Sequence, residues 1–187
     1  MNTDAELMRR ALALAETARR RTPPNPWVGA VLVADGTVVG EGATQPPGGP
    51  HAEIGALRAA GDRARGATAY VTLEPCSHHG RTPPCVDALV EAGVARVVVA
   101  LQDPDHHVAG QGIASLREHG ITVDVGIEAE TAARLLAPYL VHRALGRSFV
   151  VLKTATSLDG RSAARDGSSR WITGPSARAD VHELRAD

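Results

Sequence analysis

Hydrophobic positions near the N-terminus recur at helical spacing. The leucine and alanine side chains between Leu7 and Ala18 fall on one face, and Thr3 with Glu6 has the spacing of a capping box. The pattern predicts an amphipathic helix over residues 4–20, which ends at the proline-broken sequence TPPNP.

The next two apolar runs predict a β-hairpin. Residues 27–34 are rich in β-forming side chains, Asp35-Gly36 is a turn signal, and residues 37–42 can return as the partner strand. Beyond the hairpin, helices and buried strands are predicted to alternate. The helices are expected to begin at about residue 51 and at Pro83-Pro84, with a third over 113–120. The strands are expected over 69–74, 95–101 and 121–126. Because strand, helix and strand in this order form a right-handed parallel crossover, a mostly parallel sheet covered on both faces is predicted.

The C-terminal part of the chain has a different pattern of predicted elements from the rest. A helix predicted over 128–146 is interrupted by Pro138. From Arg147 the sequence SFVVLKTATSLDG predicts a new strand, a Gly/Ser loop follows, and ARADVHELRAD begins another helix. Two domains are therefore predicted, residues 1–146 and residues 147–187.

Composition and charge narrow the classes of function. With 20 Lys and Arg against 21 Asp and Glu, and only two Trp, two Tyr and one Phe, the chain lacks the basic excess and the aromatic platforms of a general nucleic-acid binder. Charges interrupt the apolar positions of the N-terminus, and no later apolar run is long enough to span a membrane. We expect a cytoplasmic protein whose partners include neither nucleic acid nor a membrane, in a reducing compartment that disfavours a structural disulfide.

Both cysteines of the chain, Cys76 and Cys85, lie in the sequence LEPCSHHGRTPPC. The two thiols could form a disulfide, or one could be a catalytic nucleophile beside an unreactive second thiol. Alternatively, both could be ligands of one metal ion. The prolines and the glycine between them allow a loop that returns Cys85 to Cys76, and thiolates near a helix N-terminus are stabilised by the helix dipole. The reducing compartment favours a metal site over a disulfide. The alternative to a functional site is that both cysteines are ordinary buried residues of the core.

A third ligand is needed, because two thiolates alone rarely bind zinc. His51, in the sequence PHAE at a predicted helix start, can face the same sheet edge, and Glu53 would lie near the metal without binding it. Three protein ligands leave a fourth position for water, whose pKa zinc lowers to about 7, and a carboxylate beside it can carry a proton to a leaving amine. This is the pattern of zinc nucleobase deaminases. A fourth ligand would close the site, so His78 and His79 are expected to be loop residues or neighbours of the ligands.

Several motifs, in family order, resemble the bifunctional riboflavin-biosynthesis deaminase/reductase family. They are NPWVGAVLV, PHAEIGAL, YVTLEPCSHHGRTPPC, GVARVVVALQDPD, VAGQG and VVLKTATSLDGRSA with SSRWITG. The resemblance implies a cytidine-deaminase-like α/β fold, a three-layer α/β/α sandwich with a mixed, mostly parallel five-stranded sheet, followed by the first fragment of a dihydrofolate-reductase-like domain. It also implies zinc-dependent hydrolytic deamination of a small molecule, 2,5-diamino-6-(5-phosphoribosylamino)pyrimidin-4(3H)-one, and favours a homo-oligomer.

The resemblance also implies roles for individual residues. It gives His51 and both cysteines to zinc and Glu53 to proton transfer. Asn25 would contact the substrate base or ribose, with a simple turn residue as the equal alternative. Arg81 stands where the family places a basic residue for the substrate phosphate, a group that suits a guanidinium.

Two positions depart from the family pattern. Thr44 stands where the family usually has a histidine, and Asp105 where it commonly has an asparagine. A carboxylate is unfavourable beside a phosphorylated ligand unless a cation compensates it, and His106 and His107 are candidates for that cation. We therefore expect an altered substrate preference, toward an unphosphorylated or differently decorated aminopyrimidine.

The last motif resembles the entrance of an NADPH-dependent reductase domain. The resemblance places Lys153, Ala155 and Trp171 at the nucleotide, and Ser169 and Arg185 at the substrate. About 40 residues are too few for a nucleotide-binding domain to close a core. We therefore expect no NADPH-dependent reductase activity from this chain alone.

Two other functions stay open on sequence grounds. A zinc deaminase of another pyrimidine or purine base would share all four catalytic residues and differ in the pocket loops. A non-catalytic, zinc-stabilised scaffold is the second, and Glu53 argues against it, because a structural site has no use for a carboxylate beside an open coordination position. Thiolate and imidazole ligands also accept iron, so zinc and iron are both candidates for the metal.

Overall fold

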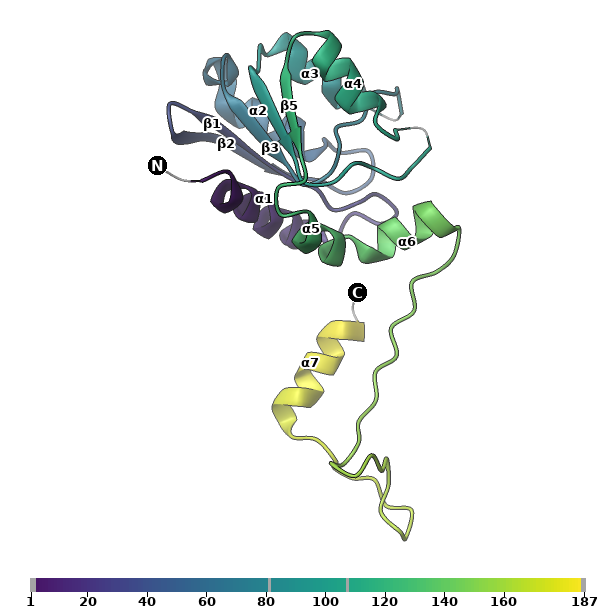
Figure 1. The fold of residues 1–187 in the computed structure, drawn as a ribbon. Coiled ribbons are helices and arrows are strands. Elements are labelled where there is room, and N and C mark those ends of the chain that lie inside the picture. The colour runs from purple at the N-terminus through teal and green to yellow at the C-terminus, as the bar shows by residue number, and fades with distance from the viewer. Residues whose placement is uncertain (1–2, 81, 107, 186–187) are drawn as a thin grey trace. The chain divides into compact units, whose positions relative to one another are not determined.

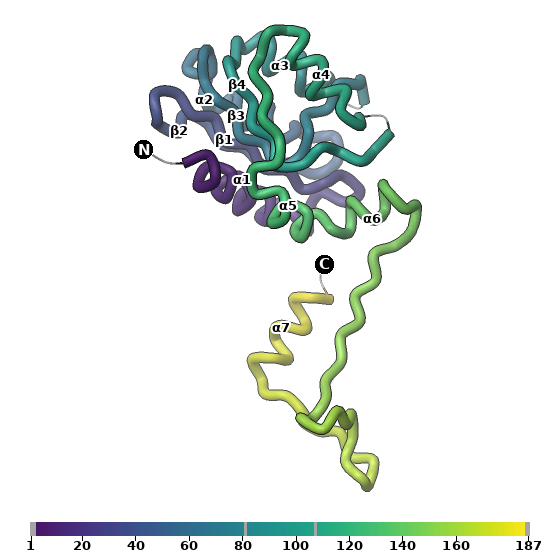
Figure 2. Tube along the Cα trace, in the orientation of Figure 1, coloured from purple at the N-terminus to yellow at the C-terminus, as the bar shows by residue number. Residues whose placement is uncertain are grey.

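The computed structural model describes residues 3–80, 82–106 and 108–185. It divides into two compact units, residues 1–149 and residues 150–187, and each is described by itself. The first unit holds the sheet and six α-helices of the described chain, and the second holds one (Figures 1 and 2).

A five-stranded mixed sheet forms the centre of the first unit. Its strands, in chain order, are β1 (Gly29–Ala34), β2 (Thr37–Ala43), β3 (Thr68–Val71), β4 (Arg96–Val99) and β5 (Thr122–Val125). Their spatial order is β2-β1-β3-β4-β5, with β1 antiparallel to both neighbours and β3, β4 and β5 parallel. Four strands therefore point the same way, as the predicted sheet requires.

Helices cover both faces of this sheet (Figure 1). On one face lie α1 (Asp4–Ala18) and α5 (Ala129–Leu135), and on the other α2 (Ala52–Ala60), the short 3-10 turn Gly61–Ala64, α3 (Cys85–Glu91) and α4 (Gln111–Glu118). Strand β3 shows the alternation that separates the layers, because Tyr70 packs with α1 whereas Ala69 and Val71 pack in the cluster with α2, α3 and α4. The predicted three-layer α/β/α sandwich is confirmed.

Glycines in β2 let α2 approach the sheet closely. A Cβ atom placed on Gly42 would lie 2.1 Å from the carbonyl oxygen of Ala52, at the first turn of α2, which no side chain could tolerate. The close packing fixes where α2 begins. It therefore also fixes the position of His51, the residue that precedes the helix.

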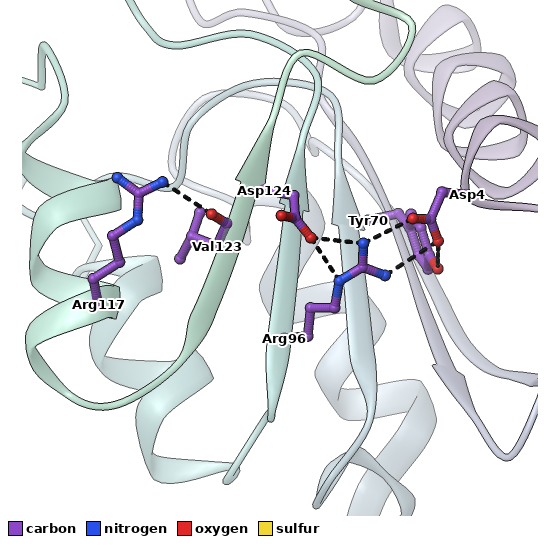
Figure 3. Close-up of polar contacts among 6 residues, drawn as sticks. All are labelled: Asp4, Tyr70, Arg96, Arg117, Val123 and Asp124. Carbon is purple, nitrogen blue, oxygen red and sulfur yellow. Dashed lines mark hydrogen bonds and ion pairs between the residues drawn. The ribbon is translucent and has the colours of Figure 1, made fainter.

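A charged cluster joins α1 to strands β3, β4 and β5 on one face of the sheet (Figure 3). Arg96 lies 2.7 Å from Asp4 of α1 and 2.6 Å from Asp124 of β5, and the Tyr70 hydroxyl donates to Asp4 across 2.7 Å. The hydrogen bond from Arg96 lowers the pKa of Asp4, and burial raises the pKa of Tyr70 to about 12. On the opposite side of β5, Arg117 donates to the carbonyl of Val123.

The region after β5 forms two helices, α5 and α6 (Ala137–Leu145), as the interrupted pattern predicts. The break falls at Leu136, just before Pro138, whose ring nitrogen has no hydrogen to donate and which is therefore tolerated in the first turn of α6. Among all described residues, no helix is both long and apolar enough to cross a membrane.

The second unit contains α7 (Pro175–Arg185) and loops. The strand predicted from SFVVLKTATSLDG is wrong, since residues 148–156 are extended without any strand pairing in the described structure. Val150 is 82% and Leu152 86% exposed. A strand needs a neighbouring strand for its backbone hydrogen bonds, and this unit offers none within the described residues.

Candidate active site

Three potential metal ligands meet at the edge of the sheet where β3 and β4 end. His51 caps the start of α2, Cys76 follows β3 by five residues, and Cys85 is the first residue of α3. The backbone N–H of Cys85 donates to the sulfur of Cys76 across 3.4 Å. The loop between the cysteines thus returns the second thiol to the first, as the sequence predicts.

The donor set fits a zinc ion. Nδ1 of His51 lies 3.6 Å from Sγ of Cys76 and 3.3 Å from Sγ of Cys85, and all three atoms lie within 4.8 Å of one another. A tetrahedral zinc with ordinary bond lengths would separate nitrogen and sulfur ligands by about 3.6 Å. Among the described residues no other group of three such donors gathers in this way, and neither His78 nor His79 joins this one.

The two thiols are electrostatically unequal. The hydrogen bond from Cys85 lowers the pKa of Cys76 to about 4, and His51 beside it acts in the same direction. The hydrogen bond to Cys76, together with burial, raises the pKa of Cys85. The thiolate form is therefore more favourable at Cys76 than at Cys85, and a bound cation would favour the thiolate at both.

Glu53 lies in the first turn of α2, two residues after His51, and is only 4% exposed. Burial raises its pKa to about 7, with a further contribution from the Cys76 thiolate. A bound cation would lower that pKa again, since an opposite charge favours the carboxylate. A carboxyl group that titrates near neutrality is suited to both accept and return a proton.

A cavity of about 380 Å³ opens onto three of these four residues, His51, Glu53 and Cys76. Asn25 lines it, as expected, and so does His78. Arg81, which was assigned to the substrate phosphate, lies outside the described residues, as does His107. Part of the predicted substrate site is thus brought together with the metal ligands.

Thr44 also lines the cavity, but its hydroxyl is engaged with the backbone. It accepts a hydrogen bond from Val28 N–H at 3.0 Å and lies 3.3 Å from the Val28 carbonyl, to which it donates. The Thr44 side chain therefore fixes the backbone of Val28, the residue before β1. The threonine that stands in place of the family's usual histidine thus has a structural role.

Asp105, in the loop after β4, lines the cavity and forms an ion pair with an arginine there. Its Oδ2 lies 3.3 Å from Nη1 of Arg143 on α6, and its Oδ1 lies 3.6 Å from Nδ1 of His106. His106 was an expected partner, whereas Arg143 was not. The His106 side chain is 82% exposed, so solvent screens its contact with Asp105.

Several residues of the cavity wall were not predicted from the sequence, among them Glu74, Tyr139 and Arg143. Glu74 is buried and accepts backbone N–H bonds from Asp103, Gly110 and Ile113, and so organises the loop after β4. A carboxylate at the end of the apolar run AYVTLE was a signal for it. A charged residue on an amphipathic helix usually faces solvent, and nothing in the sequence set Arg143 apart.

Comparison with known proteins places this site in a family. Residues 1–101 match the sequence profile described as cytidine and deoxycytidylate deaminase zinc-binding region, and these residues include all three donors and Glu53. The chain belongs to this family. Residues 148–187 match a second profile, described as RibD C-terminal domain. The zinc-binding description of the family thus agrees with the arrangement of the three donor atoms, which fits a zinc ion.

Individual relatives in the family share the order of both segments. The riboflavin biosynthesis protein RibD of Escherichia coli K12 is 55% identical over 183 residues, which cover 98% of this chain and 50% of that protein. The structure of Acinetobacter baumannii RibD superposes with a TM-score of 0.91 at 51% identity, covering 98% of this chain and 51% of that one. The chain spans about half the length of the curated relatives it matches, and the resemblance seen in its motifs is confirmed.

A third similar protein, from Thermotoga maritima, has a description that states its chemistry. It is described as a diaminohydroxyphosphoribosylaminopyrimidine deaminase/5-amino-6-(5-phosphoribosylamino)uracil reductase. It is 42% identical with a TM-score of 0.89, and the match covers 97% of this chain and 52% of that one.

The residues predicted to bind NADPH and the reductase substrate lie in the second unit. Ser169 and Trp171 line a hollow in its loop, and the guanidinium of Arg178 stacks 4.2 Å from the Trp171 ring centre. Lys153 and Ala155 lie on the extended segment before this hollow, and Arg185 ends α7. No described residue of the unit is buried, so these side chains do not form a closed nucleotide site that would fit NADPH.

Proposed function

We propose that this chain hydrolytically deaminates 2,5-diamino-6-(5-phosphoribosylamino)pyrimidin-4(3H)-one, replacing its 2-amino group with oxygen and releasing ammonia. The observation that carries the proposal is Glu53, a carboxyl group that is only 4% exposed, beside a three-donor cluster that leaves one tetrahedral position open. The names of the relatives support the choice of substrate.

In this proposal His51, Cys76 and Cys85 hold a zinc ion. When bound, zinc acts as a Lewis acid that lowers the pKa of a water molecule to about 7. Glu53 accepts a proton from the attacking water and delivers it to the departing nitrogen, so that water and substrate become the carbonyl product and ammonia. The apolar wall formed by Val28 and Leu73 limits the access of bulk water to these residues.

Arg81 keeps its proposed role as a phosphate ligand on the strength of its place in the motif. Asn25 keeps its role at the base or ribose, and its position on the cavity wall supports that role. Replacing Arg81 with Ala should raise KM far more than it changes zinc content. An unchanged KM would remove this role.

Two rival functions differ in what they require of the site. A zinc deaminase of another base would retain Glu53 and the ligands, and a panel of pyrimidines and purines as substrates separates it from the proposed activity. A zinc-stabilised scaffold requires no buried carboxyl group beside the donors, so the burial of Glu53 at this place favours the enzyme. Assembly into a homo-oligomer stays a prediction.

Ammonia release from the phosphorylated aminopyrimidine, with and without a chelator, tests the proposal. We expect release that stops when the metal is removed and returns when zinc is restored. Iron that restores activity better than zinc would correct the metal but keep the reaction. Absence of release with the zinc-loaded chain would contradict the proposed function. NADPH oxidation with the deaminated product is expected to be absent from this chain.

A further inference from the structure

Arg143 lies on α6 at the wall of the cavity, beside the loop that follows β4. One of its terminal nitrogens is 3.3 Å from the Asp105 carboxylate, and its guanidinium lies 5.6 Å from the centre of the Tyr139 ring. The Arg143 side chain is 40% exposed, while that of Asp105 is 11% exposed. A guanidinium offers five N–H donors, so pairing at one nitrogen leaves donors for a ligand in the cavity.

The charges around the cavity make Arg143 the natural contact for an anion. It is the only lysine or arginine among the described residues that line the cavity. Two of the carboxylates there are engaged with other groups, since Glu74 accepts three backbone N–H bonds and Asp103 accepts the Tyr139 hydroxyl. Four carboxyl groups line the described cavity as well, so Arg143 is the lysine or arginine side chain there with which an anionic group could pair.

We propose that Arg143 binds the phosphate of the substrate and that Asp105 is a positioning residue that holds the guanidinium at the cavity wall. The inference rests on the proposed function, because it takes a phosphorylated aminopyrimidine as the ligand. It reverses the preference expected from the sequence, in which Asp105 repels a phosphate. With Arg143 paired to it, Asp105 favours phosphate binding through the arginine.

Kinetics of ammonia release with the phosphorylated substrate and its dephosphorylated form test the role of Arg143. We expect R143Q to raise KM for the phosphorylated substrate about 10- to 100-fold, the range of a charge-assisted contact, with kcat changed less than about threefold. KM for the dephosphorylated form should change less than about threefold. R143K, which keeps the charge, should restore part of the discrimination.

Asp105 is tested by a double-mutant cycle with Arg143. D105N removes the charge with little change of shape, and it should raise KM for the phosphorylated substrate in the parent chain. In the R143Q background it should no longer do so, because a positioning residue acts through the group it positions. An equal rise in both backgrounds would overturn this role of Asp105.

A matched control and a separate binding measurement complete the test. R10Q removes another partly exposed arginine that is paired with a carboxylate, Glu41, away from the cavity, and should leave both KM values unchanged. Thermal shift with ribose 5-phosphate as the probe reports anion binding without turnover. We expect the shift to be much smaller in R143Q than in the parent chain, because one of the two arginines proposed to bind the phosphate is gone, and to be retained in full in R10Q.

The two kinds of failure are distinguishable. If the parent chain releases no ammonia but R143Q reduces the ribose 5-phosphate shift, the proposed function falls and the anion site stands. If the parent chain deaminates the substrate but R143Q raises both KM values equally, the function stands and the phosphate role of Arg143 is overturned. A ribose 5-phosphate shift that R143Q retains in full would likewise overturn it.

Discussion

The Tyr139 hydroxyl donates to Oδ2 of Asp103 across 2.9 Å and so fastens α6 to the loop that follows β4. Asp103 also accepts the backbone N–H of Asp105 across 2.9 Å. The one carboxylate therefore connects the helix that carries Arg143 with the loop that carries its partner. The wall of the cavity is built from segments about 35 residues apart in sequence that meet at Asp103.

Replacing Tyr139 with Phe should loosen this wall while keeping the ring. Burial raises the pKa of Asp103, and the Tyr139 hydrogen bond opposes that rise, so its loss leaves a buried carboxylate short of a donor. We expect a loss of about 1–2 kcal/mol in the free energy of unfolding at neutral pH.

The pH dependence of Y139F has a definite sign. A folded-state pKa above the unfolded value means that ionised Asp103 costs stability, and the cost grows as pH rises through the folded pKa. The deficit of Y139F should therefore be larger at about pH 7 than at about pH 4, as measured by thermal melts. Equal melting temperatures of the two proteins at neutral pH would contradict the hydrogen bond.

Replacing Glu53 with Gln separates catalysis from metal binding. The amide cannot accept a proton, so kcat should fall by roughly 10²- to 10⁴-fold while zinc content and melting temperature stay close to those of the parent. Elemental analysis and ammonia release measure the two quantities. A scaffold protein would show the same zinc content and no turnover to lose in either form.

Glu74 provides the matched control for that variant. It too is a buried glutamate of the cavity wall, but its oxygens accept three backbone N–H bonds. E74Q should lower the melting temperature, because an amide replaces one accepting oxygen with a donor that faces N–H groups. If E53Q destabilised the chain as much as E74Q, the loss of activity by E53Q could not be assigned to proton transfer.

Replacing Gly112 with Ala should disturb the metal site from a distance. A Cβ atom there would lie 2.0 Å from the carbonyl oxygen of Pro75, the residue before Cys76. The backbone must move to relieve the clash, and we expect lower zinc content together with a loss of about 1–3 kcal/mol in stability. G174A, where no heavy atom lies within 4 Å of the added group, is the control, and full zinc content in G112A would refute the expectation.

Replacing Asp4 with Asn tests the charged cluster between α1 and the sheet. Hydrogen bonding to Arg96 lowers the pKa of Asp4, so its contribution is present above the ordinary value of 3.8 and is lost as pH falls through the lowered pKa. Because these side chains are partly exposed and screened, we expect D4N to cost about 0.5–1 kcal/mol near neutral pH and nothing in acid. D35N, in the hairpin turn, should cost nothing at either pH.

The sequence predicts that the three candidate metal ligands gather, because their signals are local. Each of His51, Cys76 and Cys85 stands beside a helix start or a strand end that periodicity and prolines indicate. The layers of the fold follow from the same periodicity. The break between α5 and α6 follows from Pro138 alone.

The cavity wall is harder to predict because its contacts join distant segments. The sequence suggests the adjacent histidines as the cation that pairs with Asp105. In the structure Asp105 also pairs with Arg143, which lies 38 positions further along the chain. Likewise, only the folded chain shows that the Thr44 hydroxyl bonds to the backbone of Val28. The strand expected after Phe149 did not form, since hydrophobic pattern alone cannot supply a pairing partner.

The Arg96 cluster lies between α1 and the sheet, whereas the candidate metal ligands lie after the end of β3 and at the starts of α2 and α3. Among the described contacts, the residues of the two groups have different hydrogen-bond partners, and mutations at sites without shared partners usually have independent effects on the free energy of unfolding. Losses of stability in one group should therefore simply add to those in the other. The residues around the cavity can then vary among relatives without a compensating change at Asp4, Tyr70 or Arg96.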